Sequence, residues 1–307
     1  MPPDSPRPNR VNIEGLDTIV SAVLEDIRNR GEEPELPTGI PLLDQEIWGL
    51  HRSELTVIAA RPGEGKTTLA LQIGTNLANM TKKVMFLSLE MTRQQLAERL
   101  LVQLTQFDAW NLRTGKDRDN FFAKVEPLKP VFEKINLRLV DGTGYTIAEV
   151  EHVMQKMLSE GGGPPDLLIV DFIQLIRLEG GMQRFDAIAE YLRALKEMSM
   201  RYSMAVLVCS QLNREATKQT PRLANLKGSG ALEELADCVI ICHWQELGTE
   251  ENPQGMKYHL LIEKQRHGAP GARIPVRFDR QRLTFHSVNE PVEKWNEQPD
   301  NGQAIEV

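Results

Sequence analysis

The sequence lacks any long run of apolar residues. No stretch of its 307 residues approaches the uninterrupted apolar length of a membrane-spanning helix. The first ten residues contain four prolines and lack the apolar core of a secretory signal. These absences disfavour a membrane or exported protein, so we expect a cytoplasmic protein with no membrane partner.

Cysteine is also scarce. The chain has three cysteines, Cys209, Cys238 and Cys242, and each lies in an apolar run typical of a buried strand. We therefore expect reduced thiols in the protein core. Cys238 and Cys242 suggest metal ligation at first sight, but no second pair of cysteines or histidines completes a zinc site. A zinc site is therefore not expected.

The chain has no excess of basic residues. Its 36 lysines and arginines are outnumbered by 43 aspartates and glutamates, which gives a net charge of −7. This balance disfavours a protein that grips nucleic acid over its whole surface, but it is compatible with a local groove for DNA. A content of 41% hydrophobic and 26% charged residues is typical of a globular protein.

From Leu55 onward, short β-rich apolar runs alternate with longer helical patterns. We expect strands over Leu55–Ala60, Val84–Leu89, Leu137–Val140, Leu167–Asp171, Ala205–Ser210, Cys238–Cys242 and His259–Glu263. We expect helices over Lys66–Asn79, Thr92–Gln106, Thr146–Ser159 and Phe185–Tyr202. This alternation predicts an α/β fold with a mostly parallel central sheet flanked by helices.

The two ends of the chain differ from this central region. After an arm without apolar periodicity, apolar residues recur at helical spacing from Ile13 to Ile27, and Gly31 ends the pattern. This short N-terminal linker helix can pack on its own domain or dock on a neighbouring subunit. Beyond Val288, an acidic tail has little to bury. We therefore predict an arm and helix over 1–31, one domain over 32–288 and a disordered tail over 289–307.

The segment Ala60-Arg61-Pro62-Gly63-Glu64-Gly65-Lys66-Thr67 follows a predicted strand and opens a predicted helix. In that setting backbone N–H groups cradle phosphates, Lys66 reaches the β- and γ-phosphates, and the Thr67 hydroxyl binds Mg²⁺. Ala60 stands where the standard pattern has glycine, so this motif by itself is also compatible with a flexible turn. The nucleotide contacts that we expect are Arg61, Pro62, Gly63, Glu64, Gly65, Lys66, Thr67 and Thr68.

Polar side chains follow three other predicted strands. Asp171 ends one strand and is suited to holding Mg²⁺. Glu90 follows another strand and can act as general base toward the attacking water, while the amide of Gln211 can sense a γ-phosphate. Each residue alone has an equally good interpretation as an exposed polar group at a strand end. Together with the phosphate loop, however, they predict ATP hydrolysis at the carboxyl edge of the sheet.

At this point the sequence resembles the DnaB-type replicative DNA helicase family from about Thr38 to Phe285. The similarity includes the phosphate-loop variant that begins with Ala60, which accounts for the missing glycine. Further matching segments are Thr38-Gly39 with Leu43-Asp44, Ser88-Leu89-Glu90-Met91, Leu112-Arg113-Thr114-Gly115, Asp171-Phe172-Ile173-Gln174-Leu175, Ser210-Gln211-Leu212-Asn213-Arg214, Ser229-Gly230-Ala231 with Ala236-Asp237, and Lys264-Gln265-Arg266 with Gly268 and Gly271.

The resemblance implies a RecA-like P-loop fold, with ATP and Mg²⁺ as cofactors. It also implies an ATP-dependent helicase or translocase of DNA replication that moves on single-stranded DNA as a homo-oligomeric ring, expected to be a hexamer. A helicase loader and primase are the implied replisome partners. By the same resemblance, Lys264 and Arg266 project into the neighbouring subunit's nucleotide site, and Arg266 is the arginine finger. The alternative for these two residues is an ordinary basic strand end in solvent.

The segment Lys227-Gly228-Ser229-Gly230 resembles the central-channel loop with which the family holds single-stranded DNA. Lys227 and the amides of Gly228 and Gly230 can then grip a phosphate without reading bases. A flexible turn is the alternative, because the family commonly has a larger polar residue at position 228. In a second departure, Trp244 stands near a position where the family usually carries an arginine beside an acid. The family's extra N-terminal domain has no counterpart ahead of the linker helix.

Two rival functions remain compatible with parts of this pattern. The first is a recombinase-type or clock-type ATPase that forms a ring or filament without unwinding DNA. The second is an interaction module that binds ATP only in order to assemble. The presence of Glu90, Asp171, Gln211 and Arg266 favours an enzyme over the second rival.

Overall fold

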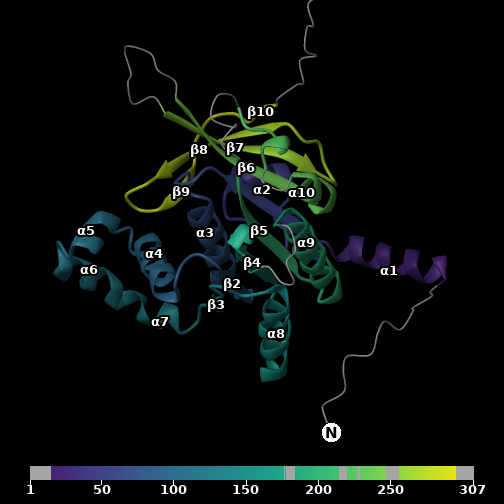
Figure 1. Cartoon of the computed structure of the whole chain (residues 1–307), viewed down its shortest axis with the longest axis horizontal. Helices are drawn as coiled ribbons and strands as arrows, with labels where there is room; N and C mark the ends of the chain where they lie inside the picture. The colour runs from purple at the N-terminus through teal and green to yellow at the C-terminus, as the bar shows by residue number, and fades with distance from the viewer. Residues whose placement is uncertain are drawn as a thin grey trace, which may run out of the picture. The chain divides into compact units, whose positions relative to one another are not determined.

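The computed structural model of the chain describes residues 15–175, 177, 184–213, 220–226, 229–246 and 256–294 (Figure 1). The chain divides into two units, residues 1–34 and 35–307. Within the first unit, α1 spans Leu16–Asn29 and confirms the predicted linker helix over those residues. None of its side chains is buried. The exposed apolar residues of α1 are Leu16, Ile19, Val20, Val23, Leu24 and Ile27.

The second unit is built on one sheet with the strand order β10-β8-β7-β6-β1-β5-β4-β2-β3, and β9 pairs with β8. The six strands from β6 to β3 in this order are parallel, which confirms the predicted α/β architecture. From β7 onward the pairing is antiparallel. The strands span Leu55–Ala60 (β1), Val84–Ser88 (β2), Leu137–Asp141 (β3), Leu167–Asp171 (β4), Ala205–Gln211 (β5), Cys238–Glu246 (β6), Met256–Gln265 (β7), Ala272–Asp279 (β8), Thr284–Ser287 (β9) and Glu293–Lys294 (β10).

Helices cover both faces of the parallel strands (Figure 1). In β1, Ile58 and Ala60 face one hydrophobic core, whereas Val57 and Ala59 face the other. Because both faces are covered, every residue of β1 is buried, as expected for a parallel strand. The first core contains residues of α2 (Pro41–Ile47), α3 (Lys66–Asn79) and α4 (Arg93–Thr105), and the second contains residues of α8 (Ile147–Met157), α9 (Arg184–Arg201) and α10 (Ser229–Leu235).

Side-chain caps set the starts of two of these helices. We expected helices to begin at Thr92 and Thr146, but both threonines are N-caps outside the helix. Each Thr side chain accepts a hydrogen bond from the backbone N–H three residues on, and the side chain of that residue, Gln95 or Glu149, bonds back to the cap. These capping boxes satisfy N–H groups that the first helical turn leaves free.

Several short elements were not predicted. The segment between α4 and β3 contains no helix longer than eight residues. Each helix there is too short for the spacing of its apolar residues to identify it in the sequence. At the other end of the chain, β10 pairs with β8 within the predicted tail, while residues 295–307 lie outside the described part of the chain. The further short elements are α5 (Ala109–Thr114), α6 (Arg118–Val125), α7 (Lys129–Phe132), a π-helical turn (Leu158–Gly162) and 3₁₀ turns at Glu126–Leu128, Ile173–Leu175 and Leu223–Asn225.

All three cysteines are free thiols buried in the core, as predicted. Burial raises the pKa of Cys238 and of Cys242 to about 12, so both thiols stay protonated at neutral pH. No helix in the described part of the chain is long and apolar enough to cross a membrane.

Candidate nucleotide-hydrolysis site

The carboxyl ends of β1, β2, β4 and β5 meet at a cavity of about 610 Å³. Open α/β sheets bind their ligands at this edge, because the strand-to-helix loops converge there. Glu90 and Gln211, predicted from different strands, both line the cavity. Of the eight predicted loop residues, six line it: Pro62, Gly63, Gly65, Lys66, Thr67 and Thr68.

The phosphate loop is shaped by its glycines and by the sheet behind it. Gly65 has a φ of +90°, and a Cβ at this position would lie 2.9 Å from the ring of Phe285 and 3.1 Å from that of Phe278. Glycine is therefore required both for the backbone conformation and for the close approach of the rings. In contrast, Ala60 is a buried residue of β1 that pairs with Gln211. This strand position demands no glycine, which explains the departure from the standard motif.

Lys66 is the centre of the charge arrangement. Its Nζ lies 3.5 Å from Oδ1 of Asp171 and 3.8 Å from Oε2 of Glu90. The same ammonium lies 4.4 Å from the centroid of the Phe172 ring and 3.5 Å from Oγ1 of Thr67. The first turn of α3 therefore brings a partly buried cation to the point where its backbone N–H groups are free for an anion.

Asp171 is fully buried, and its carboxylate is paired with Lys66 but accepts no hydrogen bond from an N–H group. A buried carboxylate in this state is costly unless another group completes its coordination. Burial raises the pKa of the Cys209 thiol well above its ordinary value, and the charge of Asp171 raises it further, so this thiol stays protonated. A carboxylate and a hydroxyl beside a polyphosphate cradle form the hard oxygen set that Mg²⁺ prefers. The residues present therefore fit ATP with Mg²⁺.

Arg61 and Glu64 do not line the cavity, although both were predicted to contact the nucleotide. Instead, Oε2 of Glu64 accepts a hydrogen bond of 3.0 Å from the backbone N–H of Arg61. The hydroxyl of Tyr258 donates to the backbone carbonyl of Glu64. Burial raises the pKa of Glu64 above its ordinary value despite these contacts with Arg61. Both residues brace the loop rather than face the ligand space.

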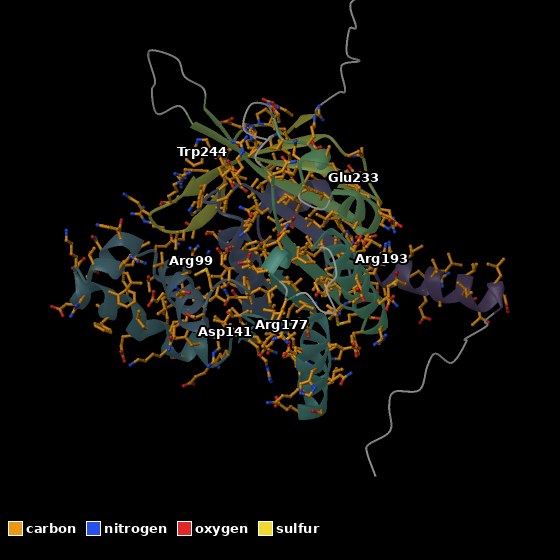
Figure 2. The ribbon with its side chains drawn as sticks, in the orientation of Figure 1. Arg99, Asp141, Arg177, Arg193, Glu233 and Trp244 are labelled. Atoms are coloured by element: carbon orange, nitrogen blue, oxygen red, sulfur yellow. The ribbon has the colours of Figure 1, made fainter. Side chains whose placement is uncertain are left out.

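Two parts of the cavity wall were missed by the sequence analysis. Arg99, labelled in Figure 2, projects from α4, and its Nη1 lies 3.4 Å from Oγ1 of Thr68. Burial lowers the pKa of Arg99, while the charges of Asp171 and Glu90 oppose that shift. The turn after β8 supplies Arg280. The alternation of apolar residues along β8 was a usable signal for this strand, whereas a single arginine on a helix was not.

Lys264 and Arg266 lie at the opposite end of the sheet. The neighbouring Gln265 pairs with Cys238 at the start of β6, and Cys238 in turn pairs with Thr56 near the start of β1. From Thr56 to the phosphate loop the strand advances about 13 Å. The structure therefore does not bring these two side chains to the cavity of their own chain. Their action on a neighbouring subunit stays a prediction.

Contacts at this opposite edge hold both basic side chains. Nη1 of Arg266 lies 3.1 Å from Oδ1 of Asp237, and the Arg266 side chain is 50% exposed. Nζ of Lys264 donates to the backbone carbonyl of Glu233. Burial lowers the pKa of Lys264, and the charge of Arg266 lowers it further. Of the predicted DNA loop, Gly230 is an exposed residue of α10, while 227 and 228 lie outside the described residues.

Comparisons with known proteins agree with this geometry. Residues 35–287 match the model of the DnaB-like helicase C terminal domain family. The chain is 31% identical over 275 residues to the replicative DNA helicase DnaB of Haemophilus influenzae, with 87% of this chain and 58% of that protein covered. It is 30% identical to the replicative DNA helicase DnaB of Geobacillus stearothermophilus, with 81% and 56% covered. The chain thus spans little more than half the length of these relatives.

Solved structures show the same fold. One solved ATPase domain superposes with a TM-score of 0.82 at 24% identity, over 90% of this chain and 100% of that one. A DnaB-like replicative helicase, solved in a study of its interactions with primase, gives a TM-score of 0.80 at 24% identity, over 89% of this chain and 68% of that one. Because the family model matches residues 35–287, which is most of its length, this chain belongs to the DnaB-like helicase C-terminal domain family.

Proposed function

We propose that this chain is the ATP-hydrolysing motor of a replicative DNA helicase and moves on single-stranded DNA as a ring of identical subunits. The observation that carries the proposal is Lys66, which lines the cavity and pairs with the carboxylates of both Asp171 and Glu90. Relatives at 30% and 31% identity are replicative DNA helicases. The rival ring or filament ATPase without unwinding has weaker support, since a KaiC-like protein superposes with a TM-score of only 0.56.

In this mechanism each residue has a task that fits its position. Lys66 and the loop N–H groups bind the phosphates, and Asp171 and Thr67 would hold Mg²⁺, which supplies charge neutralisation at the β- and γ-phosphates. Glu90, whose side chain is 51% exposed, takes a proton from the attacking water. Gln211, at the end of β5 beside the start of the phosphate loop, senses the γ-phosphate.

Assembly completes the site in the proposed ring. Arg266 lies at the amino edge of the strands, whereas the cavity lies at the carboxyl edge, so one subunit can present its finger to the cavity of the next. Contacts between two different surfaces generate a closed ring when the rotation closes. The exposed apolar stripe of α1 supplies a second surface that can dock on a neighbouring copy. A hexamer is the proposed state.

The proposed DNA contact is local. Because the chain carries a net charge of −7, single-stranded DNA must be gripped by a small set of groups, for which Lys227, Gly228 and Gly230 are proposed. Lys227→Ala should weaken binding and reduce the slope of log affinity against log salt by about 0.7 per lost phosphate contact. Lys129→Ala, which changes an exposed lysine paired with Glu126, is the matched control. An unchanged slope would count against the channel loop.

A strand-displacement assay on forked DNA with ATP and Mg²⁺, read beside electron micrographs of the same sample, tests the whole proposal. We expect rings that displace a strand, and we expect Lys66→Ala to lose nucleotide binding, ATPase and displacement together. Filaments, or rings that hydrolyse ATP without displacement, would select the rival function. Primase and a helicase loader are the partners proposed for binding assays, primase first because a solved relative was studied with it.

A further inference from the structure

A tryptophan outside the cavity lining and an arginine of the lining form a stack. Cζ of Arg280 lies 3.9 Å from the centroid of the Trp244 ring. Arg280 lines the cavity and remains exposed, so the Trp244 ring covers its side chain only in part. Trp244, labelled in Figure 2, stands near a position where the family resemblance implies an arginine beside an acid. The structure thus brings an arginine from the β8–β9 turn to this place.

The tryptophan ring is held rigidly from behind. Tyr258 packs edge-on against Trp244 with centroids 5.9 Å apart, and it also contacts the ring of Phe278 at 5.7 Å. The hydroxyl of Tyr258 is bonded to the phosphate-loop residue Glu64. The charges of Arg280 and Glu64 also interact, and Arg280 partly offsets the raised pKa of that carboxyl. The stack and the phosphate loop are therefore joined through the same buried residues.

The position of the Trp244–Arg280 stack determines which part of a bound nucleotide it can contact. When a nucleotide places its phosphates on Lys66 and the loop amides, its base must lie elsewhere along the cavity wall. The side chains of Phe278, Arg280 and Leu283 form a stretch of wall from the β8–β9 hairpin, and this stretch contains none of the groups proposed for hydrolysis. A planar guanidinium stacks on aromatic rings and is only weakly hydrated, so its exposed part suits a flat base.

We propose that Arg280 is a nucleobase-binding residue that stacks its guanidinium on the base, and that Trp244 is its positioning residue. This inference rests on the proposed nucleotide site and names its specificity. Stacking uses the π-face that every base has, so the contact favours the larger purines over pyrimidines and reads no base edge. The stack then stabilises nucleoside phosphates but not free polyphosphate.

The test compares a ligand with a base and one without. Isothermal titration calorimetry of the full chain with Mg²⁺-ADP and with Mg²⁺-tripolyphosphate measures both affinities. For Arg280→Ala and Trp244→Leu we expect ADP binding to weaken by roughly 10-fold, the usual effect of losing one base stack. Tripolyphosphate binding should change less than about twofold, because no phosphate contact is lost.

Matched variants and a spectroscopic signal sharpen this experiment. Arg282 lies in the same turn but pairs with Asp279 and does not line the cavity, so Arg282→Ala should bind both ligands like the parent. Trp244→Phe retains a ring and should recover part of the ADP affinity. ADP, but not tripolyphosphate, should change the fluorescence contributed by Trp244, measured as parent minus Trp244→Phe.

The outcomes separate this inference from the proposed function. Equal losses for both ligands in Arg280→Ala would make Arg280 a phosphate contact and overturn base stacking. Unchanged ADP affinity in Arg280→Ala would overturn base stacking as well. If Lys66→Ala still abolished ADP binding in that case, the proposed function would stand. If the parent chain bound neither ligand, both proposals would fail. Arg280 lies in an exposed turn, so Arg280→Ala keeps the test valid even if Trp244→Leu does not fold.

Discussion

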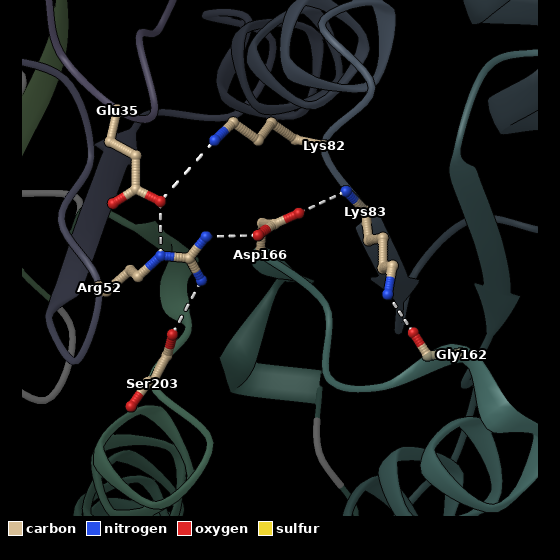
Figure 3. Close-up of polar contacts among 7 residues, drawn as sticks. All are labelled: Glu35, Arg52, Lys82, Lys83, Gly162, Asp166 and Ser203. Atoms are coloured by element: carbon tan, nitrogen blue, oxygen red, sulfur yellow. Dashed lines mark hydrogen bonds and ion pairs between the residues drawn. The ribbon is translucent and has the colours of Figure 1, made fainter. Parts of the chain in front are cut away.

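The aspartates at the two edges of the parallel strands differ in their hydrogen bonding. At the amino edge, Asp166 receives a 2.5 Å hydrogen bond from Nη2 of Arg52 and a 2.7 Å bond from the backbone N–H of Lys83 (Figure 3). Arg52 also donates to Glu35 and to the carbonyl of Ser203. Partial burial raises the pKa of Asp166, but the bonds from Arg52 and Lys83 outweigh it and leave the pKa below its ordinary value.

Asp237 repeats this pattern on the next strands of the amino edge. Its Oδ2 accepts hydrogen bonds from the backbone N–H of Leu55 at 2.7 Å and from Nζ of Lys196 at 2.6 Å. Its Oδ1 pairs with Arg266. At the carboxyl edge, by contrast, Asp171 is equally buried and is paired with Lys66 at 3.5 Å, but it accepts no hydrogen bond from an N–H group. Carboxylates that accept several hydrogen bonds within the chain hold the fold together, whereas a buried carboxylate paired with Lys66 alone among the described residues still has oxygen lone pairs for a ligand.

The largest expected effect is a loss of ATP hydrolysis, at the carboxyl edge, caused by a substitution at the amino edge. Arg266→Ala should leave ATP binding and assembly intact, because Lys66, Thr67 and Asp171 are unchanged within each chain. Its ATPase activity should fall by about 10³- to 10⁵-fold, the range associated with arginine fingers. Steady-state phosphate release measures this loss.

A mixing experiment then separates action on the neighbour from action within the chain. The Lys66→Ala chain has an inactive phosphate loop but an intact arginine finger. The Arg266→Ala chain has an intact phosphate loop but no arginine finger. Mixed rings should regain part of the activity that neither parent variant shows. No recovery in samples proven to contain mixed rings would contradict a finger supplied across the interface.

The next effect tests the two buried aspartates directly. Asp237→Asn should lower the free energy of unfolding by about 3 kcal/mol, because Lys196, Arg266 and Leu55 lose a buried charged acceptor. Asp171→Asn should cause a smaller loss without nucleotide, because Asp171 has its ion pair with Lys66 but accepts no hydrogen bond from an N–H group, yet it should abolish ATPase activity. Urea unfolding of both variants measures the two losses in unfolding free energy. Similar losses would mean that the two aspartates do not differ in their contribution to stability.

Glu90→Gln separates binding from chemistry at the carboxyl edge. The amide keeps the shape of the side chain but cannot accept a proton, so hydrolysis should fall by roughly 100-fold or more. Binding of Mg²⁺-ATP should persist, because Lys66 retains Asp171 as a partner. Single-turnover kinetics with an equilibrium binding titration measures both quantities. Turnover near the parent value would reduce Glu90 to a structural residue.

The smallest expected effect is a pH dependence of the folding stability, in which His243 and Asp166 act at different pH values. Burial lowers the pKa of His243 from 6.5 to about 4, with the charges of Arg61 and His259 adding to the shift. The unfolded chain therefore takes up the proton first, and stability falls as the pH drops from about 6.5 toward 4. Asp166, whose pKa is below 3.8, contributes its stability above that pH and loses it only below.

Mild acid thus tests His243, because His286, whose pKa burial also lowers, is present in the parent and in both variants. Between pH 7.5 and pH 5, the melting temperature of His243→Gln should fall by about 2 °C less than that of the parent. His267→Gln, which changes an exposed side chain, should behave like the parent. Equal acid sensitivity in all three proteins would mean that protonation of His243 is not coupled to unfolding.

Much of the site could be predicted because its central residues are local in the sequence. The phosphate loop is one contiguous segment, and the acids follow apolar runs that are buried strands in the structure. Arg99 and Arg280 could not be found in this way. Arg99 is an isolated arginine on α4, and Arg280 reaches the cavity only because β8 and β9 fold back beside the loop.

The sequence by itself determined that buried strands alternate with helices and that a phosphate loop, a strand-end aspartate and a glutamate occur together. Periodicity and short motifs record these features, since they depend on neighbours along the chain. Only the tertiary structure decided that Asp171 lacks hydrogen bonds from N–H groups while Asp237 has them, and that Arg266 lies across the sheet from the cavity. Strand order and register set those distances, because they join residues that no local pattern connects.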